Sequence, residues 1–408
     1  MLAAAAVLLL GAALMVVAKF LVAWFQRLNE ESQGRLAEAH FDDPLSLKPV
    51  PCPSVFGEPS KTLSIVIPAY NEQDRLPATL TETMIYLQRR RDRQGAFFTY
   101  EVIVVDDGSK DGTVKKAFEF VRQHGIDAVR VLRLPRNRGK GAAVKAGSLC
   151  ARGRRVLFMD ADGATKVSDM ERLEAKLADI SGAGLDSLQG PKAGTLDSAL
   201  GGALGPRRGR LQQQAQQQQQ GQQQPGGGGA GSTLLVGKGE ELGLVLGSRA
   251  DLQEQAIAKR TAVRNFLMHG FHFLVTMVVG NQMRDTQCGF KKQLTRQAKP
   301  PKLCLKDASS SMLTLFKPLQ MMTRRAAQQL FSNQRLQRWC FDVELVYLAQ
   351  QLKIPMAEVQ VNWTEVPGSK IRPTSMIHMA GELAAIRLGY GLGLWTVRGE
   401  EELATKQC

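Results

Sequence analysis

Three short apolar runs in this 408-residue sequence end in polar or acidic residues that could do chemistry. The residues at these ends are Pro68-Ala69-Tyr70-Asn71-Glu72, Asp106-Asp107-Gly108-Ser109 and Asp160-Ala161-Asp162. A lone Asp-x-Asp is a weak signal, because acidic residues often cap helices. Three such ends in chain order favour a shared site.

Asp160 and Asp162 stand two residues apart, a spacing that lets two carboxylates flank one turn. A nucleotide diphosphate carries about two negative charges that must be neutralised before it can leave. Paired carboxylates can hold Mg²⁺ or Mn²⁺ against the diphosphate oxygens, where the cation acts as a Lewis acid. The pair therefore predicts a site for a nucleotide-linked substrate.

The elements that must position these residues alternate between strands and helices. Runs rich in Val, Ile and Leu predict buried parallel strands. The predicted strands cover 63–68, 102–105, 129–134 and 156–159, and the helices cover 75–91, 112–123, 140–152 and 166–180. This alternation predicts an α/β fold with a Rossmann-like, open, mostly parallel sheet and flanking helices. Ligands of such sheets bind beyond the carboxyl ends of the strands.

Two segments interrupt this pattern. Residues 182–238 are rich in Gly, Gln, Pro and Ser, a composition that cannot bury enough apolar surface to offset its ordering entropy. Residues 292–322 are basic, contain three prolines and lack clear periodicity. We predict a low-complexity insert and a basic insert, with a strand at 242–246 between them.

Later motifs complete a resemblance to the inverting family 2 glycosyltransferases of the GT-A fold, and within them to the dolichyl-phosphate β-glucosyltransferases. The motifs lie at 137–141 (Asn-Arg-Gly-Lys-Gly), 247–250 (Gly-Ser-Arg-Ala), 284–291 (Arg-Asp-Thr-Gln-Cys-Gly-Phe-Lys), 339–344 (Trp-Cys-Phe-Asp-Val-Glu) and 361–365 (Val-Asn-Trp-Thr-Glu). The resemblance implies metal-dependent transfer of glucose from UDP-glucose to dolichyl phosphate for N-linked glycan assembly. It covers about 62–180 and 242–390, within a domain predicted to span 62–396.

The same resemblance implies roles for individual residues. The uridine pocket would be lined by Pro68, Tyr70, Glu72 and Asp107. The metal and diphosphate would bind at Asp160 and Asp162, with the Ala161 backbone nearby. Phosphate groups of donor or acceptor would be held by Arg249, Arg264 and Lys291, and the sugar would lie near Asp342 and Glu344. One departure is Ala164, which replaces a glutamine that serves related mannosyl enzymes as a further metal ligand.

The implied acceptor needs little general-base help, because a phosphate oxygen is already anionic at pH 7. Cationic residues that orient the acceptor should therefore matter more than a proton acceptor. Among the predicted catalytic residues Asp162, Asp342 and Arg249, we accordingly expect Asp342→Asn to be less damaging than Arg249→Ala.

The first 25 residues are almost continuously apolar, broken only by Lys19. Spanning a bilayer takes about 20 such residues. The run is long and has no basic start, which favours an uncleaved signal anchor at 1–26 over a cleaved signal peptide. A linker at 27–61 would follow. The resemblance implies a single-pass protein of the endoplasmic reticulum membrane, with its catalytic domain in the cytosol.

Three other functions are compatible with parts of this sequence. A dolichyl-phosphate mannose synthase using GDP-mannose would share the fold, but the motif at 284–291 favours the glucosyl enzyme. A net charge of +15 suggests an anionic partner such as nucleic acid. More than half of that charge lies in the two inserts, and no basic stripe interleaved with aromatics predicts nucleic-acid binding. An inactive protein, whose site the basic insert blocks, is the remaining alternative.

Three further segments stay open at the level of sequence. The Gly-Lys-Gly at 139–141 is either an ordinary strand–helix turn or a ligand-side loop, since it lacks the full P-loop pattern. Residues 266–279 predict a core or interfacial helix. Residues 377–395 predict a helix against core or membrane, since Glu382 and Arg387 argue against a second span.

Overall fold

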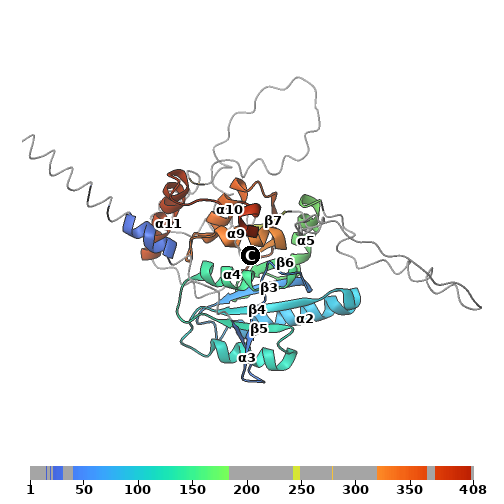
Figure 1. The fold of residues 1–408 in the computed structure, drawn as a ribbon. Coiled ribbons are helices and arrows are strands. Elements are labelled where there is room, and N and C mark those ends of the chain that lie inside the picture. Colours follow the sequence, from blue (N-terminus) through green and yellow to red (C-terminus); the bar gives the residue numbers. More distant parts are fainter. Residues whose placement is uncertain are drawn as a thin grey trace, which may run out of the picture.

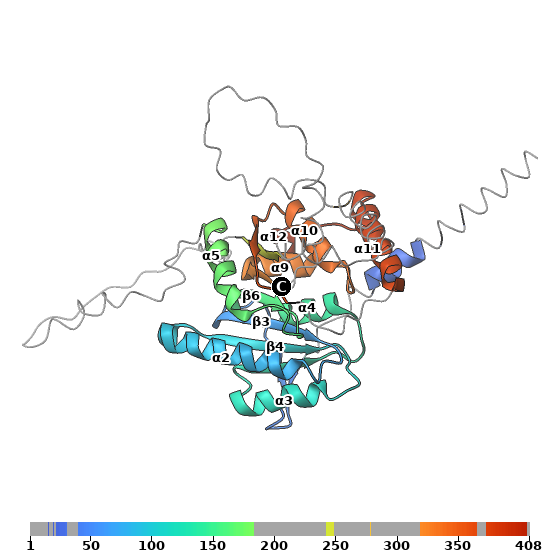
Figure 2. The same ribbon diagram turned by 180° about the vertical axis from the view of Figure 1, so that it is seen from behind.

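The computed structural model describes residues 15, 19, 22–30, 40–182, 242–248, 278, 319–364 and 373–405. Within this part of the chain, nine strands form one sheet in the order β2-β1-β5-β4-β3-β6-β8-β7-β9. Helices cover both faces of the sheet (Figures 1 and 2). The predicted inserts lie mostly outside the described residues.

The centre of the sheet is parallel. It consists of β5 (Val129–Arg133), β4 (Tyr100–Asp106), β3 (Lys61–Ala69) and β6 (Gly153–Met159). Every residue of β4 is buried, as expected for a strand covered on both faces. These four strands confirm the four apolar runs predicted from the sequence. Their carboxyl ends carry the acidic residues to one edge.

The flanks of the sheet make it mixed, so the prediction of a mostly parallel sheet was wrong. On one side, β1 (His40–Asp42) and β2 (Pro49–Pro51) add antiparallel to β5. On the other side, β8 (Leu319–Thr323) is antiparallel to both β6 and β7 (Leu244–Ser248), and β9 (Met356–Gln360) is parallel to β7. Strand β8 begins inside the segment predicted as the basic insert. Its Leu-Gln-Met-Met-Thr sequence lacks the β-branched run that marks the central strands.

Side-chain alternation along the central strands divides the core into two layers. One layer joins residues such as Ile65 and Val104 to α2 (Leu76–Gln94), α3 (Thr113–His124) and α5 (Met170–Ile180). The other joins residues such as Val66 and Phe158 to a second set of helices. That set comprises α4 (Lys140–Leu149), α9 (Arg324–Asn333), α10 (Phe341–Gln351) and α11 (Pro373–Gly391). Helices α2 to α5 confirm the four predicted helices, and α12 (Glu400–Thr405) follows α11.

A helical segment at 22–30 packs beside α11 in both ribbon views (Figures 1 and 2). The Phe25 ring lies 5.5 Å from that of Trp395 and is buried. The predicted helix at 377–395 is confirmed as α11, which buries Leu383 and Ile386 in the core. In the described part of the chain, no helix is both long and apolar enough to cross a membrane. Most of the predicted anchor at 1–26 lies outside the described residues.

Candidate functional site

The loops that follow β3 and β4 are joined to each other. The backbone N–H of Asn71 donates to Ser109 Oγ at 2.9 Å, and the N–H of Lys110 donates to Asn71 Oδ1 at 2.9 Å. Asn71 has a φ of 52°, a left-handed conformation that asparagine tolerates better than most residues. Pro68 and Tyr70 are half-buried beside this junction. The first two predicted strand ends therefore form one continuous rim.

Glu72 is held by Arg75. The Arg75 guanidinium donates two hydrogen bonds to the carboxylate, at 2.6 and 2.7 Å, and the Glu72 N–H donates to Thr113 Oγ1. Burial opposes the charge on Arg75, yet the hydrogen bond and attraction to Glu72, aided by Asp162 and Asp160, raise its pKa. Arg75 thus brings a positive charge toward the Asp-x-Asp turn, a role that the sequence analysis missed.

Asp107 organises the loop before α4. Its two carboxylate oxygens accept the backbone N–H groups of Arg138 and Gly139, at 2.7 and 2.8 Å. Gly139 has a φ of 102°, and a Cβ there would lie 2.6 Å from the carbonyl oxygen of Gln337. Burial raises the Asp107 pKa, while the two backbone donors lower it in part. Asp107 is only 3% exposed, and its hydrogen bonds fix this loop. It would therefore shape the predicted nucleotide pocket through the loop.

Asp160 and Asp162 follow β6 directly, as predicted. Asp162 Oδ1 accepts the N–H of Ala164 at 3.0 Å, which closes the turn. The carbonyl oxygen of Ala161 accepts the Thr79 hydroxyl at 2.9 Å, which ties the turn to α2. Burial and the nearby charge of Asp160 raise the Asp162 pKa. A cation beside Asp162 would favour the charged form of its carboxylate.

Lys140 supplies positive charge at this point. It is the first residue of α4, and its Nζ lies 2.5 Å from Asp160 Oδ1. Burial opposes the ammonium charge, but Asp160, Asp342 and Asp162 outweigh it and raise the Lys140 pKa. The Gly-Lys-Gly at 139–141 therefore lies against the Asp-x-Asp turn, a position compatible with the ligand-side alternative.

Asp342 faces the same group of charges from the first turn of α10. Its side chain is buried, with the residue 4% exposed, and Oδ1 accepts the N–H of Val343 at 3.0 Å. Burial raises the Asp342 pKa to about 7, although the Lys140 charge lowers it. Asp342, predicted to lie near the sugar, thus joins Lys140, Asp160 and Asp162 in one electrostatic cluster.

Asp160 and Asp162 fit a divalent cation, because the ammonium of Lys140 marks a position where this site accepts positive charge. Among the described residues, no group of three or more His, Cys, Asp or Glu side chains could form a complete metal shell. Ala164, two residues after Asp162, is buried, and its side chain offers no metal ligand. Donor phosphate oxygens would have to complete the coordination.

The motif at 361–365 reaches the same turn through its described residues, 361–364. The N–H of Thr364 donates to the Ala164 carbonyl at 2.8 Å, and Trp363 pairs with Thr165 as an isolated bridge. Asp169 accepts both the backbone and the side-chain N–H of Asn362, at 2.6 and 2.9 Å. The segment after β9 therefore forms one wall beside the Asp-x-Asp turn.

Glu344, the second residue expected near the sugar, contacts the loop before α10 and the helix α11 rather than the acidic cluster. The carboxylate accepts the N–H groups of Arg335 and Leu336, at 2.9 and 2.7 Å, and the Tyr390 hydroxyl at 2.8 Å. Residues two apart on a helix point to different sides, so Asp342 and Glu344 cannot both face the site. Glu344 instead holds the loop before α10 and connects it to α11.

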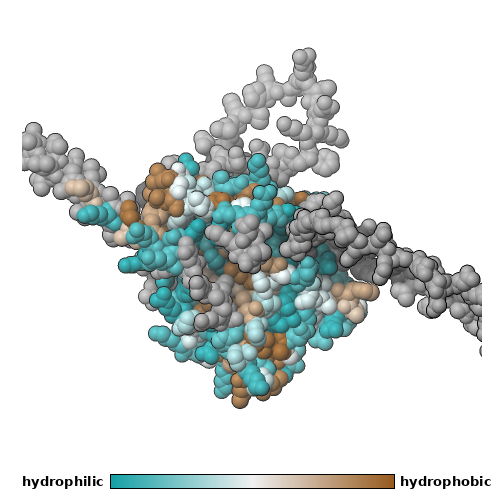
Figure 3. Space-filling view, viewed as in Figure 1, coloured by the Kyte–Doolittle hydropathy of each residue, from teal (hydrophilic) through white to brown (hydrophobic). Residues whose placement is uncertain are grey.

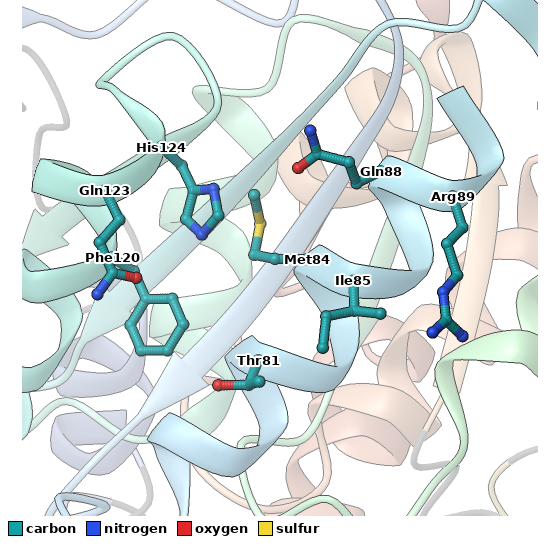
Figure 4. A pocket seen from close by; sticks show the side chains of 8 residues that line it. All are labelled: Thr81, Met84, Ile85, Gln88, Arg89, Phe120, Gln123 and His124. Atoms are coloured by element: carbon teal, nitrogen blue, oxygen red, sulfur yellow. The ribbon is translucent and has the colours of Figure 1, made fainter. Parts of the chain in front are cut away.

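Arg249, Arg264 and Lys291 lie outside the described residues, so their predicted phosphate contacts stay predictions. A pocket of about 280 Å³ lies elsewhere, between α2 and α3 (Figure 4). It is lined by Met84, Ile85, Phe120 and His124, among others. His124 ends α3, whose C-terminus leads back to the start of β5, at the edge opposite the strand ends. The acidic cluster and this pocket are separate features.

Comparison with known proteins gives the family. Residues 64–219 match the family described as Glycosyl transferase family 2. The chain is 39% identical to the dolichyl-phosphate beta-glucosyltransferase of Mus musculus, over 85% of this chain and 81% of that protein. It is 38% identical to the protein of that name from Drosophila melanogaster, over 88% of this chain and 85% of that protein. The Homo sapiens protein of that name is 38% identical, with 84% and 80% covered.

These relatives match most of the chain, and the family match at 64–219 includes the strand ends that carry Asp107, Asp160 and Asp162. The α/β architecture with a mixed sheet and flanking helices is the GT-A-like fold expected of such enzymes. The relatives bear the name of a glucosyltransferase, so the mannosyl alternative is not favoured. The chain belongs to the dolichyl-phosphate beta-glucosyltransferase family of the family 2 glycosyltransferases.

Proposed function

We propose that this protein transfers glucose from UDP-glucose to dolichyl phosphate with inversion at the anomeric carbon. The observation that carries the proposal is the meeting of Asp107, Asp160 and Asp162 at one sheet edge, with Lys140 against Asp160. At this edge, the carboxylates would bind a cation and the Lys140 ammonium would attract an anion, as a nucleotide diphosphate donor requires. The names of the relatives supply the sugar and the acceptor.

The chain's own residues divide the work of the transfer. The rim formed by Pro68, Tyr70 and Asn71 offers a site for the nucleoside, and Asp107 fixes the loop behind it. Asp160 and Asp162 would hold Mg²⁺ or Mn²⁺, which would supply Lewis-acid stabilisation of the leaving diphosphate. Lys140 would contribute a second positive charge at the same place.

The acceptor phosphate attacks as an anion, so no side chain has to remove a proton at pH 7. Asp342 would act by its charge and its contact with the sugar rather than as a general base. Its buried position opposite Lys140 suits this role. Arg249, Arg264 and Lys291 remain the proposed phosphate contacts.

We also propose that the protein resides in the endoplasmic reticulum membrane with its catalytic domain facing the cytosol. The apolar sequence at 1–25 supports the membrane assignment. The buried free thiols of Cys150 and Cys340 suit a reducing compartment. Nucleic acid is not a proposed partner.

The experiment compares labelled UDP-glucose with labelled GDP-mannose as donors to dolichyl phosphate in vesicles, using the purified full chain. We expect label in the lipid fraction only from UDP-glucose, and loss of that label when a chelator removes divalent cations. Transfer from GDP-mannose alone would overturn the donor assignment. Undiminished transfer with chelator would overturn the metal assignment and leave the sugar assignment standing.

A further inference from the structure

Exposed leucines gather at the C-terminal end of α11. Leu388, Leu392 and Leu394 are 38%, 69% and 58% exposed, and Val22 in the helical segment 22–30 is 55% exposed. Figure 3 shows apolar atoms collected over α11 at the upper left. We call Val22, Leu388, Leu392 and Leu394 the α11 patch.

Buried aromatic side chains hold the two parts of the α11 patch together. The Trp395 ring lies 5.5 Å from Phe25 and 5.3 Å from Tyr390. Trp24 lies against α11 near Gly381, where an added Cβ would be 3.7 Å from the indole. The exposed leucines therefore belong to a segment that packs through aromatic contacts against the helical segment 22–30.

A lipid bilayer is the occupant that the chain itself indicates. The sequence before residue 22 is almost continuously apolar, and it leads directly into Val22 of the helical segment 22–30. Arg27 of that segment and Arg387 of α11 are both exposed, and they would meet lipid phosphates. Apolar side chains rimmed by arginines are typical of surfaces that lie in the headgroup region.

We propose that the α11 patch inserts into the headgroup–acyl boundary of the bilayer, as a contact additional to the apolar N-terminal sequence. This inference rests in part on the proposed lipid acceptor. It places the end of α11 at the membrane surface, from which a phosphate attached to a lipid would reach the acidic cluster.

Two buried carboxylates connect this helix to the site. Glu382 of α11 accepts the N–H groups of Trp339 and Cys340, at 3.1 and 2.7 Å, directly before α10. Tyr390 of α11 donates to Glu344 of α10. A helix lying on the membrane would thus hold the start of α10, and with it Asp342, at a fixed height above the lipid.

The first test places an environment-sensitive fluorescent amino acid at position 392 of the full chain, reconstituted in phosphatidylcholine–phosphatidylserine vesicles. Position 47 is the matched control, because Leu47 is 86% exposed in the turn between β1 and β2, at one edge of the sheet and on a different element from the α11 patch. We expect a blue-shifted emission at 392 that lipid-borne quenchers reduce, and a water-like emission at 47. A water-like emission at 392 in membrane-bound protein would overturn the proposal.

The second test measures transfer by the double variant Leu392→Glu and Leu394→Glu, with Leu47→Glu as control. We expect KM for vesicle-embedded dolichyl phosphate to rise about tenfold or more. KM for a short, water-soluble polyprenyl phosphate should stay unchanged, as should thermal unfolding. Equal effects on both acceptors would overturn the proposal. If neither acceptor is used by the wild type, the proposed function fails, while the fluorescence result still decides the membrane contact.

Discussion

Two groups of buried or half-buried carboxylates differ in how many hydrogen-bond donors they meet. Glu344 and Glu382 each accept at least two backbone N–H groups, and Glu344 also accepts the Tyr390 hydroxyl. Asp162 and Asp342 each accept one N–H from their own turn and otherwise face other charges. Burial raises the pKa in both groups. The pKa shift alone therefore does not separate these two groups, whereas the number of N–H donors does.

The largest effect is expected at Asp162. Asp162→Ala should reduce kcat/KM for glucose transfer by on the order of 10³, because the diphosphate loses a carboxylate that holds its cation. The midpoint of thermal unfolding should barely change, since Asp162 accepts one hydrogen bond from the described part of the chain. Asp179→Asn is the control, an exposed acid paired with Lys176. Retained transfer in folded Asp162→Ala would remove the metal assignment.

The reverse pattern is expected at Glu344. Glu344→Ala should lower the free energy of unfolding by about 3 kcal/mol or more, because it leaves buried N–H groups without an acceptor. Chemical denaturation measures this loss. Protein that remains folded at low temperature should keep a donor KM near the wild-type value. An unchanged free energy of unfolding would show that donor count does not mark structural acids here.

Lys140 tests the role of positive charge beside the acidic cluster, because its ammonium contacts Asp160. Lys140→Ala should reduce kcat/KM by on the order of 10², while Lys140→Arg should restore part of the loss. The same Ala variant should bind Mn²⁺ more tightly when no nucleotide is present, because the ammonium no longer occupies Asp160. Electron paramagnetic resonance of free Mn²⁺ measures that binding. Weaker Mn²⁺ binding by Lys140→Ala would contradict the proposed competition.

A further prediction concerns the pH dependence of stability. The folded Asp342 pKa of about 7 exceeds its ordinary value of 3.8, so the native state holds an extra proton between these pH values. The free energy of unfolding should therefore fall as pH rises from about 4 to 7 and then level off. One pKa unit corresponds to about 1.4 kcal/mol. Asp342→Asn should flatten this slope, as urea denaturation at several pH values would show. An identical slope in the variant would contradict a raised pKa for Asp342 in the folded protein.

The central strands and their acidic ends could be predicted from the sequence because the signals are local. A run of apolar residues followed by Asp106 or Asp160 predicts both the strand and the end of that strand at the edge of the sheet. Strand β8 escaped prediction because its residues pair across the sheet with β6 and β7, and only that pairing makes Gln320 a buried strand residue. Long-range pairing leaves no periodic signal in a five-residue run.

The acids of the site could be predicted more completely than its cations. Lys140 stayed an open alternative because its motif lacks the full phosphate-loop pattern, and Arg75 was missed because it lies in an ordinary helix start. Lys140 reaches Asp160 across two separate loops, whereas Arg75 contacts Glu72 only three residues before it. Glu344 could have been distinguished from Asp342 by the sequence alone. Residues two apart on a helix point to different sides, so the two carboxylates of α10 cannot share one face.

The most direct measurement follows labelled glucose from UDP-glucose into dolichyl phosphate, with wild-type chain and Asp162→Ala side by side in the same vesicles. The account predicts a glucosylated lipid product with the wild type in the presence of Mg²⁺ or Mn²⁺, and none above background with the variant. No lipid-linked glucose from folded wild type, or equal amounts from both proteins, would contradict it.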